Sequence, residues 1–67
     1  MKITLNNREE EFGKGSMTVS ELIDVKNYTF KMLVVKINNK LVKKHDYDSA
    51  IINEGDNVMV LHMISGG

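Results

Sequence analysis

The group with the clearest chemical potential lies at the end of the sequence. Ser65-Gly66-Gly67 places a carboxylate after two residues that have no side chain. Because glycine has no Cβ, such a segment can adopt extended or strained conformations and pass through a narrow tunnel in another protein. The Gly67 carboxylate could then be presented to a partner's active site. The alternative is a frayed tail without a function, and two glycines alone do not separate these interpretations.

The remaining polar side chains offer little for catalysis or metal binding. The sequence has no cysteine, which excludes a thiol nucleophile, a disulfide and a thiolate zinc site. His62 lies in an apolar segment, where we expect an interior or patch-forming side chain rather than a catalytic one. The run His45-Asp46-Tyr47-Asp48 is interpreted as a solvated turn, because a structural metal site needs about four ligands and the others are not evident. We therefore expect this chain to provide no catalytic residue and to bind no metal or cofactor.

Two other polar segments are also interpreted as structural. Glu9, Glu10 and Glu11 are consecutive, so on a strand their carboxylates alternate between faces and cannot form a paired acid and base. We expect them to be solvated. Gly13-Lys14-Gly15-Ser16 has the residue types of a phosphate-binding loop but not its order, Gly-x-x-x-x-Gly-Lys-Ser/Thr. This segment is predicted to be a connecting turn.

Length and composition indicate one small soluble domain. The chain has 67 residues, of which 42% are apolar and 27% charged, and its formal net charge is zero. These values are typical of a globular domain with a single core, and balanced charge gives no general attraction to nucleic acid or to an anionic membrane. The apolar runs are too short for a signal core or a membrane span. We expect a cytoplasmic protein that is a monomer when free, without nucleic-acid or membrane partners.

The first part of the sequence predicts a hairpin. Alternation of apolar and polar residues predicts a strand over residues 2–6, with Ile3 and Leu5 on one face. Asn6-Asn7 should form a tight turn, because asparagine tolerates positive φ. The return strand over residues 8–12 is highly charged, which suits the edge of a sheet because charge discourages pairing with another molecule.

A helix is predicted to begin near Thr18. In Thr18-Val19-Ser20-Glu21 the Thr18 side chain can accept from the backbone N–H of Glu21 while the Glu21 side chain reaches back, which is a capping box. Three apolar residues then recur at helical spacing and form one stripe: Val19, Leu22 and Ile23. Asn27 can adopt the left-handed conformation that ends a helix.

A second hairpin is predicted after the helix. Residues 31–37 are rich in β-branched residues, and Lys36 marks the exposed face of the strand. The residues expected to point inward are Leu33, Val35 and Ile37. Asn38-Asn39-Lys40 predicts a turn, and residues 41–42 predict a short return strand.

The last third of the sequence ends in the most apolar segment. Residues 43–48 are expected to be irregular, and residues 50–52 to supply apolar anchors in a loop or a single helical turn. Residues 53–56 predict a turn with Gly55 where a positive φ is easiest. Residues 58–64 have no clean alternation and should form a central strand with both edges paired. Its natural neighbour is the first strand.

These elements predict an α+β fold with a mixed sheet, because one helix can cover only one face of a sheet of this size. On the last strand, Val58 and Val60 should point into the core. The opposite face would present Met59, Leu61 and Met63. Such residues would suit a docking surface, since flexible methionine side chains can repack against different partners. The alternative is that the chain itself covers Met59 and Leu61.

Several segments taken together have a specific likeness to a known family. They are residues 1–6, Thr18-Val19-Ser20-Glu21-Leu22-Ile23, Val35-Lys36-Ile37-Asn38-Asn39-Lys40-Leu41-Val42, Ile52-Asn53-Glu54-Gly55-Asp56-Asn57-Val58 and Gly66-Gly67. In these segments the chain resembles, over essentially its whole length, the ThiS-type sulfur carriers of thiamin biosynthesis. The resemblance implies a single ubiquitin-like β-grasp domain over residues 1–67, with roughly four or five strands in a mixed sheet, one main helix on one face and a flexible tail at residues 65–67.

The resemblance further implies a protein cosubstrate rather than an enzyme. A ThiF-type adenylyltransferase would use ATP and magnesium to convert the Gly67 carboxylate into an acyl-adenylate, and persulfide sulfur derived from a cysteine desulfurase would displace AMP. The resulting thiocarboxylate would donate sulfur to a ThiG-type thiazole synthase. Ser65 and Gly66 would form the tail that carries Gly67.

The sequence also departs from the family's usual pattern. Many members have Val-Pro-Arg and a nearby Trp where this chain has Val42-Lys43-Lys44 and Tyr47. Lys44 keeps the positive charge but not the planar fork of arginine, so a partner contact there can differ. The absence of proline before Gly66-Gly67 favours a thiamin-type carrier over the similar small subunit of molybdopterin synthase. The alternatives are a carrier for another pathway (molybdopterin, amino acid or tRNA thiolation), a ubiquitin-like modifier, and a β-grasp interaction module.

Overall fold

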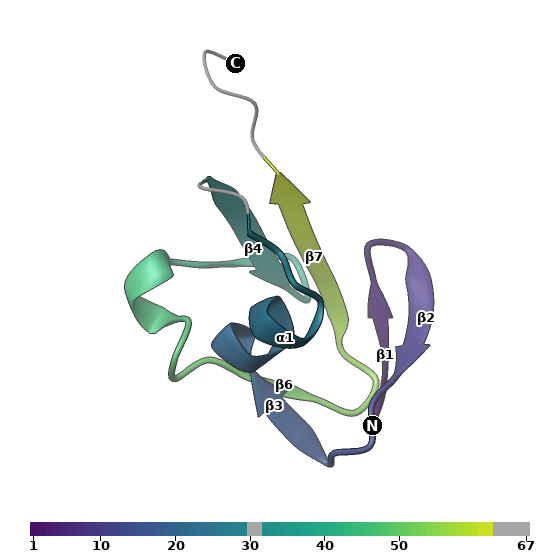
Figure 1. Ribbon diagram of the computed structural model, residues 1–67. Coiled ribbons are helices and arrows are strands. Elements are labelled where there is room, and N and C mark those ends of the chain that lie inside the picture. Colours follow the sequence, from purple (N-terminus) through teal and green to yellow (C-terminus); the bar gives the residue numbers. More distant parts are fainter. Residues whose placement is uncertain (30–31, 63–67) are drawn as a thin grey trace.

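The computed structural model describes residues 1–29 and 32–62, which form a five-stranded sheet, a two-stranded sheet and one α-helix (Figure 1). The large sheet has the order β2-β1-β7-β4-β5. Its strands are β1 (Lys2–Leu5), β2 (Arg8–Glu11), β4 (Leu33–Ile37), β5 (Lys40–Val42) and β7 (Asn57–His62). The small sheet pairs β3 (Ser16–Thr18) with β6 (Ile51–Asn53), and the helical elements are α1 (Val19–Val25) and the 3₁₀ turn η1 (Lys44–Asp46).

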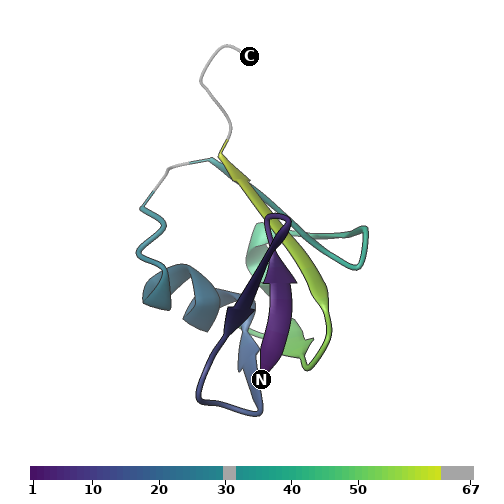
Figure 2. The same cartoon turned by 90° about the vertical axis from the view of Figure 1, so that its right-hand side faces the viewer.

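β7 lies at the centre of the large sheet, between β1 and β4. It runs parallel to β1, with Leu5 opposite Val58, and antiparallel to β4, with Val35 opposite Val60. Both edges of this apolar strand are paired, which confirms the prediction of a central last strand beside the first one. The mixed sheet with one helix on one face also confirms the α+β, β-grasp architecture (Figure 2).

A single apolar core fills the space between α1 and the sheet. Its buried residues are Ile3, Leu5, Met17, Val19, Leu22, Val35, Ile52, Val58 and Val60. Partly buried side chains pack against this cluster, among them Ile23, Leu33 and Ile37. The inward-facing residues predicted for the first strand, the helix and residues 31–37 are therefore confirmed, while Lys31 itself lies outside the described residues.

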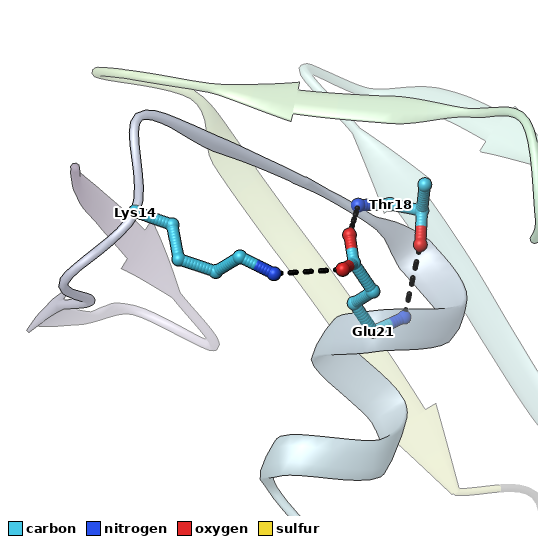
Figure 3. Close-up of polar contacts among 3 residues, drawn as sticks. All are labelled: Lys14, Thr18 and Glu21. Carbon is cyan, nitrogen blue, oxygen red and sulfur yellow. Dashed lines mark hydrogen bonds and ion pairs between the residues drawn. The ribbon is translucent and has the colours of Figure 1, made fainter.

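α1 begins at the predicted capping box (Figure 3). Thr18 Oγ1 accepts a hydrogen bond from the backbone N–H of Glu21 at 3.0 Å, and Glu21 Oε1 accepts one from the N–H of Thr18 at 2.8 Å. Lys14, from the connecting turn predicted before the helix, donates from Nζ to Glu21 Oε2 at 2.7 Å. The hydrogen bond from Lys14, together with that from the Thr18 backbone, holds the pKa of Glu21 below its usual 4.5.

Asparagines supply the tight turns between elements. Asn6 and Asn7 have φ values of 51° and 66°, and Asn38 and Asn39 have φ values of 51° and 70°. Two consecutive residues with positive φ give a hairpin turn that matches the right-handed twist of the flanking strands. Asn27, with φ of 57°, follows α1. All three predicted positions for asparagine turns are confirmed.

The small sheet corrects the predictions for two segments. β6 takes the place of the loop or helical turn expected at residues 50–52, and its partner β3 was not predicted at all. Each strand has three residues and one buried side chain, Met17 and Ile52 respectively, which is too short for alternation to be recognised. Part of the segment 43–48, expected to be irregular, forms η1. Gly55, with φ of 82°, makes the predicted turn before β7.

The edge strand β2 is less solvated than its sequence indicates. Glu9 and Glu11 are exposed, but Glu10 is half-buried and accepts hydrogen bonds from Lys26 Nζ at 2.8 and 2.9 Å. The hydrogen bonds to Glu10 raise the pKa of Lys26, and the ion pair ties the end of α1 to the edge of the sheet. The prediction of a fully solvated acidic run is therefore wrong for Glu10, whose partner is distant in the sequence.

Candidate functional site

β7 presents apolar side chains to both sides of the sheet. Val58 is fully buried and Val60 is 6% exposed, whereas Leu61 is 42% exposed and Met59 is half-buried. The predicted division of the strand into a core face and an outer face is confirmed for these residues. The sequence left open whether this outer face is exposed or covered by the chain. Leu61 is exposed, whereas Met59 is partly covered.

The strand register extends this outer face over β4 and β5. Leu61 lies opposite Val34, Met59 lies opposite Lys36, and Lys36 lies opposite Leu41. Opposed residues of antiparallel strands point to the same face. We call the surface formed by Val34, Lys36, Leu41, Met59 and Leu61 the outer-face patch. Sequence reasoning missed Val34, which is two residues from Lys36 on the same strand, and Leu41, which lies opposite Lys36 on β5.

The other predicted site residues follow β7. Met63, Ser65, Gly66 and Gly67 lie outside the described residues, so their roles in docking and in the tail stay predictions. The last residue of β7, His62, lies opposite Leu33, the first residue of β4. The chain therefore continues toward Gly67 from the end of the sheet at which β4 begins.

Neither histidine is part of a catalytic or metal cluster in the described part of the chain. His62 is exposed rather than interior, and its register opposite Leu33 places it on the helix side of the sheet, not in the outer-face patch. His45 Nε2 lies 3.5 Å from Asp46 Oδ2, with both side chains largely exposed. Within residues 1–29 and 32–62, no three side chains of metal-binding type come together. In the same residues, no helix has the length and apolarity needed to cross a membrane.

A second apolar surface lies between α1 and β4 and includes Val34 and Leu41 of the outer-face patch. It is an open groove of about 750 Å³, bounded by the end of α1, by β4 and by the segment that leads from β5 into η1. Its lining residues are Ile23, Tyr28, Met32, Leu33, Val34, Leu41, Val42, Lys43, Lys44 and Tyr47. We call it the helix-side groove. The lining is mostly apolar, and its charged members are both lysines.

The segment after β5 gives the groove its polar groups. The Tyr47 hydroxyl donates to the carbonyl oxygen of Leu33 at 3.5 Å, and burial raises the pKa of Tyr47. Lys43, Lys44 and Tyr47 all line the groove. They are also the residues at which the sequence differs from the usual pattern of the family that it resembles. The structure therefore collects these departures on one surface, which the sequence alone did not indicate.

Comparison with known proteins gives matches over the whole chain. Residues 3–67 match the family model described as ThiS family. The chain is 31% identical over 67 residues to a protein of Paramagnetospirillum magneticum named thiazole synthase. That match covers 100% of this chain and 20% of the relative, so the chain spans about a fifth of the relative's length.

Two solved structures share the fold. A crystal structure of the thiamine biosynthesis protein (ThiS) from Geobacter metallireducens has a TM-score of 0.90 and 25% identity and is covered, like this chain, over 100% of its length. An NMR solution structure of a thiamine biosynthesis protein from the same organism has a TM-score of 0.79 and 25% identity, with 100% of this chain and 88% of that chain covered. Both likenesses extend over the complete sheet and helix described above.

Proposed function

The chain belongs to the ThiS family of sulfur carriers in thiamine biosynthesis, and we propose that the carboxyl group of Gly67 is the group on which it carries sulfur. The observation that supports this site is the extent of the family match, which runs through residue 67 and includes both glycines. The proposal requires Gly67 to be the last residue of the mature protein, and the experiment below begins by measuring this.

Gly67 must be activated before it can accept sulfur. The negative charge of a carboxylate is shared by two oxygens, which makes its carbon a poor electrophile. In the proposed cycle, a ThiF-type adenylyltransferase joins the carboxylate to the α-phosphate of ATP with the help of magnesium and releases pyrophosphate. A persulfide sulfur from a cysteine desulfurase attacks the acyl carbon, and AMP leaves. A thiol then reduces the acyl disulfide and frees the thiocarboxylate.

In this proposal the chain is a cosubstrate, and a ThiG-type thiazole synthase receives the sulfur. The relative named thiazole synthase supports the pairing, because a region matching this entire chain occupies 20% of that protein. In that protein, a region similar to this chain and the rest of the sequence form one polypeptide. A sulfur carrier and the enzyme that receives its sulfur can still interact when they are joined in one polypeptide.

We assign the docking of partner enzymes to the outer-face patch. Leu61 and Leu41 are 42% and 61% exposed, and Met59 contributes a flexible, half-buried side chain beside them. Exposed apolar side chains that gather on one face are typical of protein interaction sites. Met63 would extend this surface toward the tail. A surface with methionines can adapt to two enzymes in turn, which a carrier requires.

Intact-mass spectrometry tests the proposed site on Gly67. The untagged protein, isolated from its own host, should have the mass of a chain that ends at Gly67. Incubation with ATP, magnesium, the adenylyltransferase of the same genome and a persulfide donor should then add the mass difference between sulfur and oxygen. Deletion of Gly67, or addition of one alanine after it, should abolish this gain while the far-UV circular dichroism spectrum stays unchanged.

The other outcomes distinguish the alternatives. An unchanged mass with an adenylyltransferase that modifies another carrier would contradict the proposal and favour an interaction module. Isopeptide-linked products in a cell extract would favour a ubiquitin-like modifier. A thiocarboxylate that thiazole synthase does not consume would keep the carrier function but point to another acceptor.

A further inference from the structure

The helix-side groove shares Val34 and Leu41 with the outer-face patch, but it also includes Ile23 of α1 and the two lysines after β5. We propose that it binds an acidic segment of thiazole synthase that inserts one bulky apolar side chain between α1 and β4. This inference rests on the proposed function, because it takes thiazole synthase as the partner. It adds a contact at α1 and at the segment after β5, next to the outer-face patch.

The lining of the groove suits an apolar anchor. Ile23, Tyr28 and Leu33 are partly buried members of the core periphery and form apolar walls. Met32 lines the same groove and is 58% exposed, so a partner side chain could cover it. An anchor of this kind, buried in a pocket, commonly supplies much of the affinity of a protein interface.

The charge around the groove suits an acidic partner. Both charged residues that line the groove are lysines, and from residue 25 to residue 45 the sequence contains six lysines and no acidic residue, while Asp46 and Asp48 flank Tyr47. The ion pairs formed within residues 1–29 and 32–62 use Lys14, Lys26 and His45 as cations, so Lys43 and Lys44 keep their charge available at the rim.

The order of the sheet enlarges this asymmetry. The acidic run of β2 lies at one edge, while β5 and its lysines lie at the opposite edge. Glu9 and Glu11 are therefore separated from Lys40, Lys43 and Lys44 by the width of the sheet, although the net charge of the chain is zero. A partner is attracted to the basic edge only in one orientation, and such complementarity mainly sets orientation and association rate.

The position of the groove connects it with the proposed sulfur transfer. Leu33 and Val34 line the groove, and they lie opposite His62 and Leu61 at the end of β7. The chain continues from this end of the sheet toward Gly67. A contact in the groove would therefore hold this end of the sheet, from which the chain leads to Gly67, against the enzyme and so orient the carrier.

A binding assay with charge-reversed variants tests the basic rim. The dissociation constant of the full-length carrier for thiazole synthase of the same genome is measured by isothermal titration calorimetry at several salt concentrations. Lys43→Glu with Lys44→Glu should weaken binding about tenfold and reduce its salt dependence. The matched control, Lys2→Glu with Arg8→Glu, makes the same change in net charge at β1 and β2 and should change the constant less than about twofold.

A pair of apolar variants tests the anchor. Met32→Ser removes an exposed side chain from the groove, whereas Val25→Ser removes one of similar exposure, 62% against 58%, from outside the groove. We expect Met32→Ser to weaken binding about fivefold or more and Val25→Ser to leave it unchanged. Thermal unfolding of each variant shows that the fold is retained.

The results separate this inference from the proposed function. If wild type and the double lysine variant bind thiazole synthase equally, or if wild type does not bind it, the assignment of the groove is wrong. Weaker binding to the adenylyltransferase alone would also overturn it. In each case the mass measurement on Gly67 still decides, independently, whether the chain carries sulfur.

Discussion

The two faces of β7 can be compared residue by residue, because the strand alternates between them. Val58 and Val60 belong to one core cluster with Val19 and Leu22 of α1. Met59 and Leu61 lie on the opposite face, where they adjoin the exposed Leu41 and the half-buried Val34 through the strand register. One strand of six residues thus has apolar side chains on both sides, but α1 covers only one side.

This difference separates residues that the fold needs from residues that we propose a partner contacts. Burial of a valine against the helix stabilises the folded domain, since apolar surface is removed from water. Leu61 gains less from folding because 42% of its surface stays exposed. In our proposal its exposed side chain contacts a partner, and substitutions on the two faces should therefore have different consequences.

The largest effect is expected on the core face. Val58→Asp places a carboxylate among apolar side chains without a partner, since no buried polar side chain is found among the described residues. The expected loss in the free energy of unfolding is more than about 4 kcal/mol, enough to unfold a small domain. Circular dichroism and amide NMR dispersion measure this. A folded Val58→Asp variant would show that the core between α1 and β7 is looser than described.

A smaller effect on stability but a clear effect on binding is expected on the outer face. Leu61→Asp should change the free energy of unfolding by less than about 1 kcal/mol and weaken binding to the adenylyltransferase about thirtyfold, because an apolar contact is replaced by a charge. The control is Val25→Asp, since Val25 is exposed on α1 away from the patch. Equal affinities for wild type and Leu61→Asp would remove the outer-face patch as the docking site.

The features that could be predicted from the sequence are those with a local cause. Asn6-Asn7 and Asn38-Asn39 adopt positive φ where hairpins need it, and the Thr18 capping box depends on residues three apart. β3 and β6 were not predicted because a strand of three residues is too short to show an alternation of apolar and polar residues. They form a sheet by pairing with each other, with Met17 opposite Ile52. These local signals suffice to place α1 and β7, whereas short strands depend on tertiary contact.

The candidate site shows the same difference between features with a local cause and features that depend on tertiary contact. The sequence correctly placed Leu61 on the face of β7 opposite Val58 and Val60 but left open whether the chain covers it, and Leu41 joined the outer-face patch only through its register with β4. The helix-side groove brings Ile23 and Tyr47 together, and no local pattern connects residues so far apart. The predicted roles of Met63 and Gly67 depend on residues beyond the described part of the chain.

The smallest predicted effect concerns the capping box that stabilises the first turn of α1. The Lys14 ammonium and the Thr18 N–H hold the pKa of Glu21 below 4.5, so the folded protein binds this proton less readily than the unfolded chain. The stabilisation is therefore present above the unfolded pKa of 4.5 and is lost as the pH falls through the lower folded pKa. It should vanish in strong acid, below both values.

Glu21→Gln isolates this contribution, because glutamine can still accept the hydrogen bond from Thr18 but cannot titrate. The melting temperature of wild type should exceed that of Glu21→Gln near pH 7, and the two should converge as the pH falls below about 4. Lys14→Gln should make the difference smaller, since the hydrogen bond from Lys14 at 2.7 Å is the largest cause of the lowered pKa. Parallel melting curves at all pH values would show that Glu21 caps the helix only through its hydrogen bond. Binding through the outer-face patch should be the same for wild type and Glu21→Gln at pH 7, because the cap acts on the opposite side of the sheet.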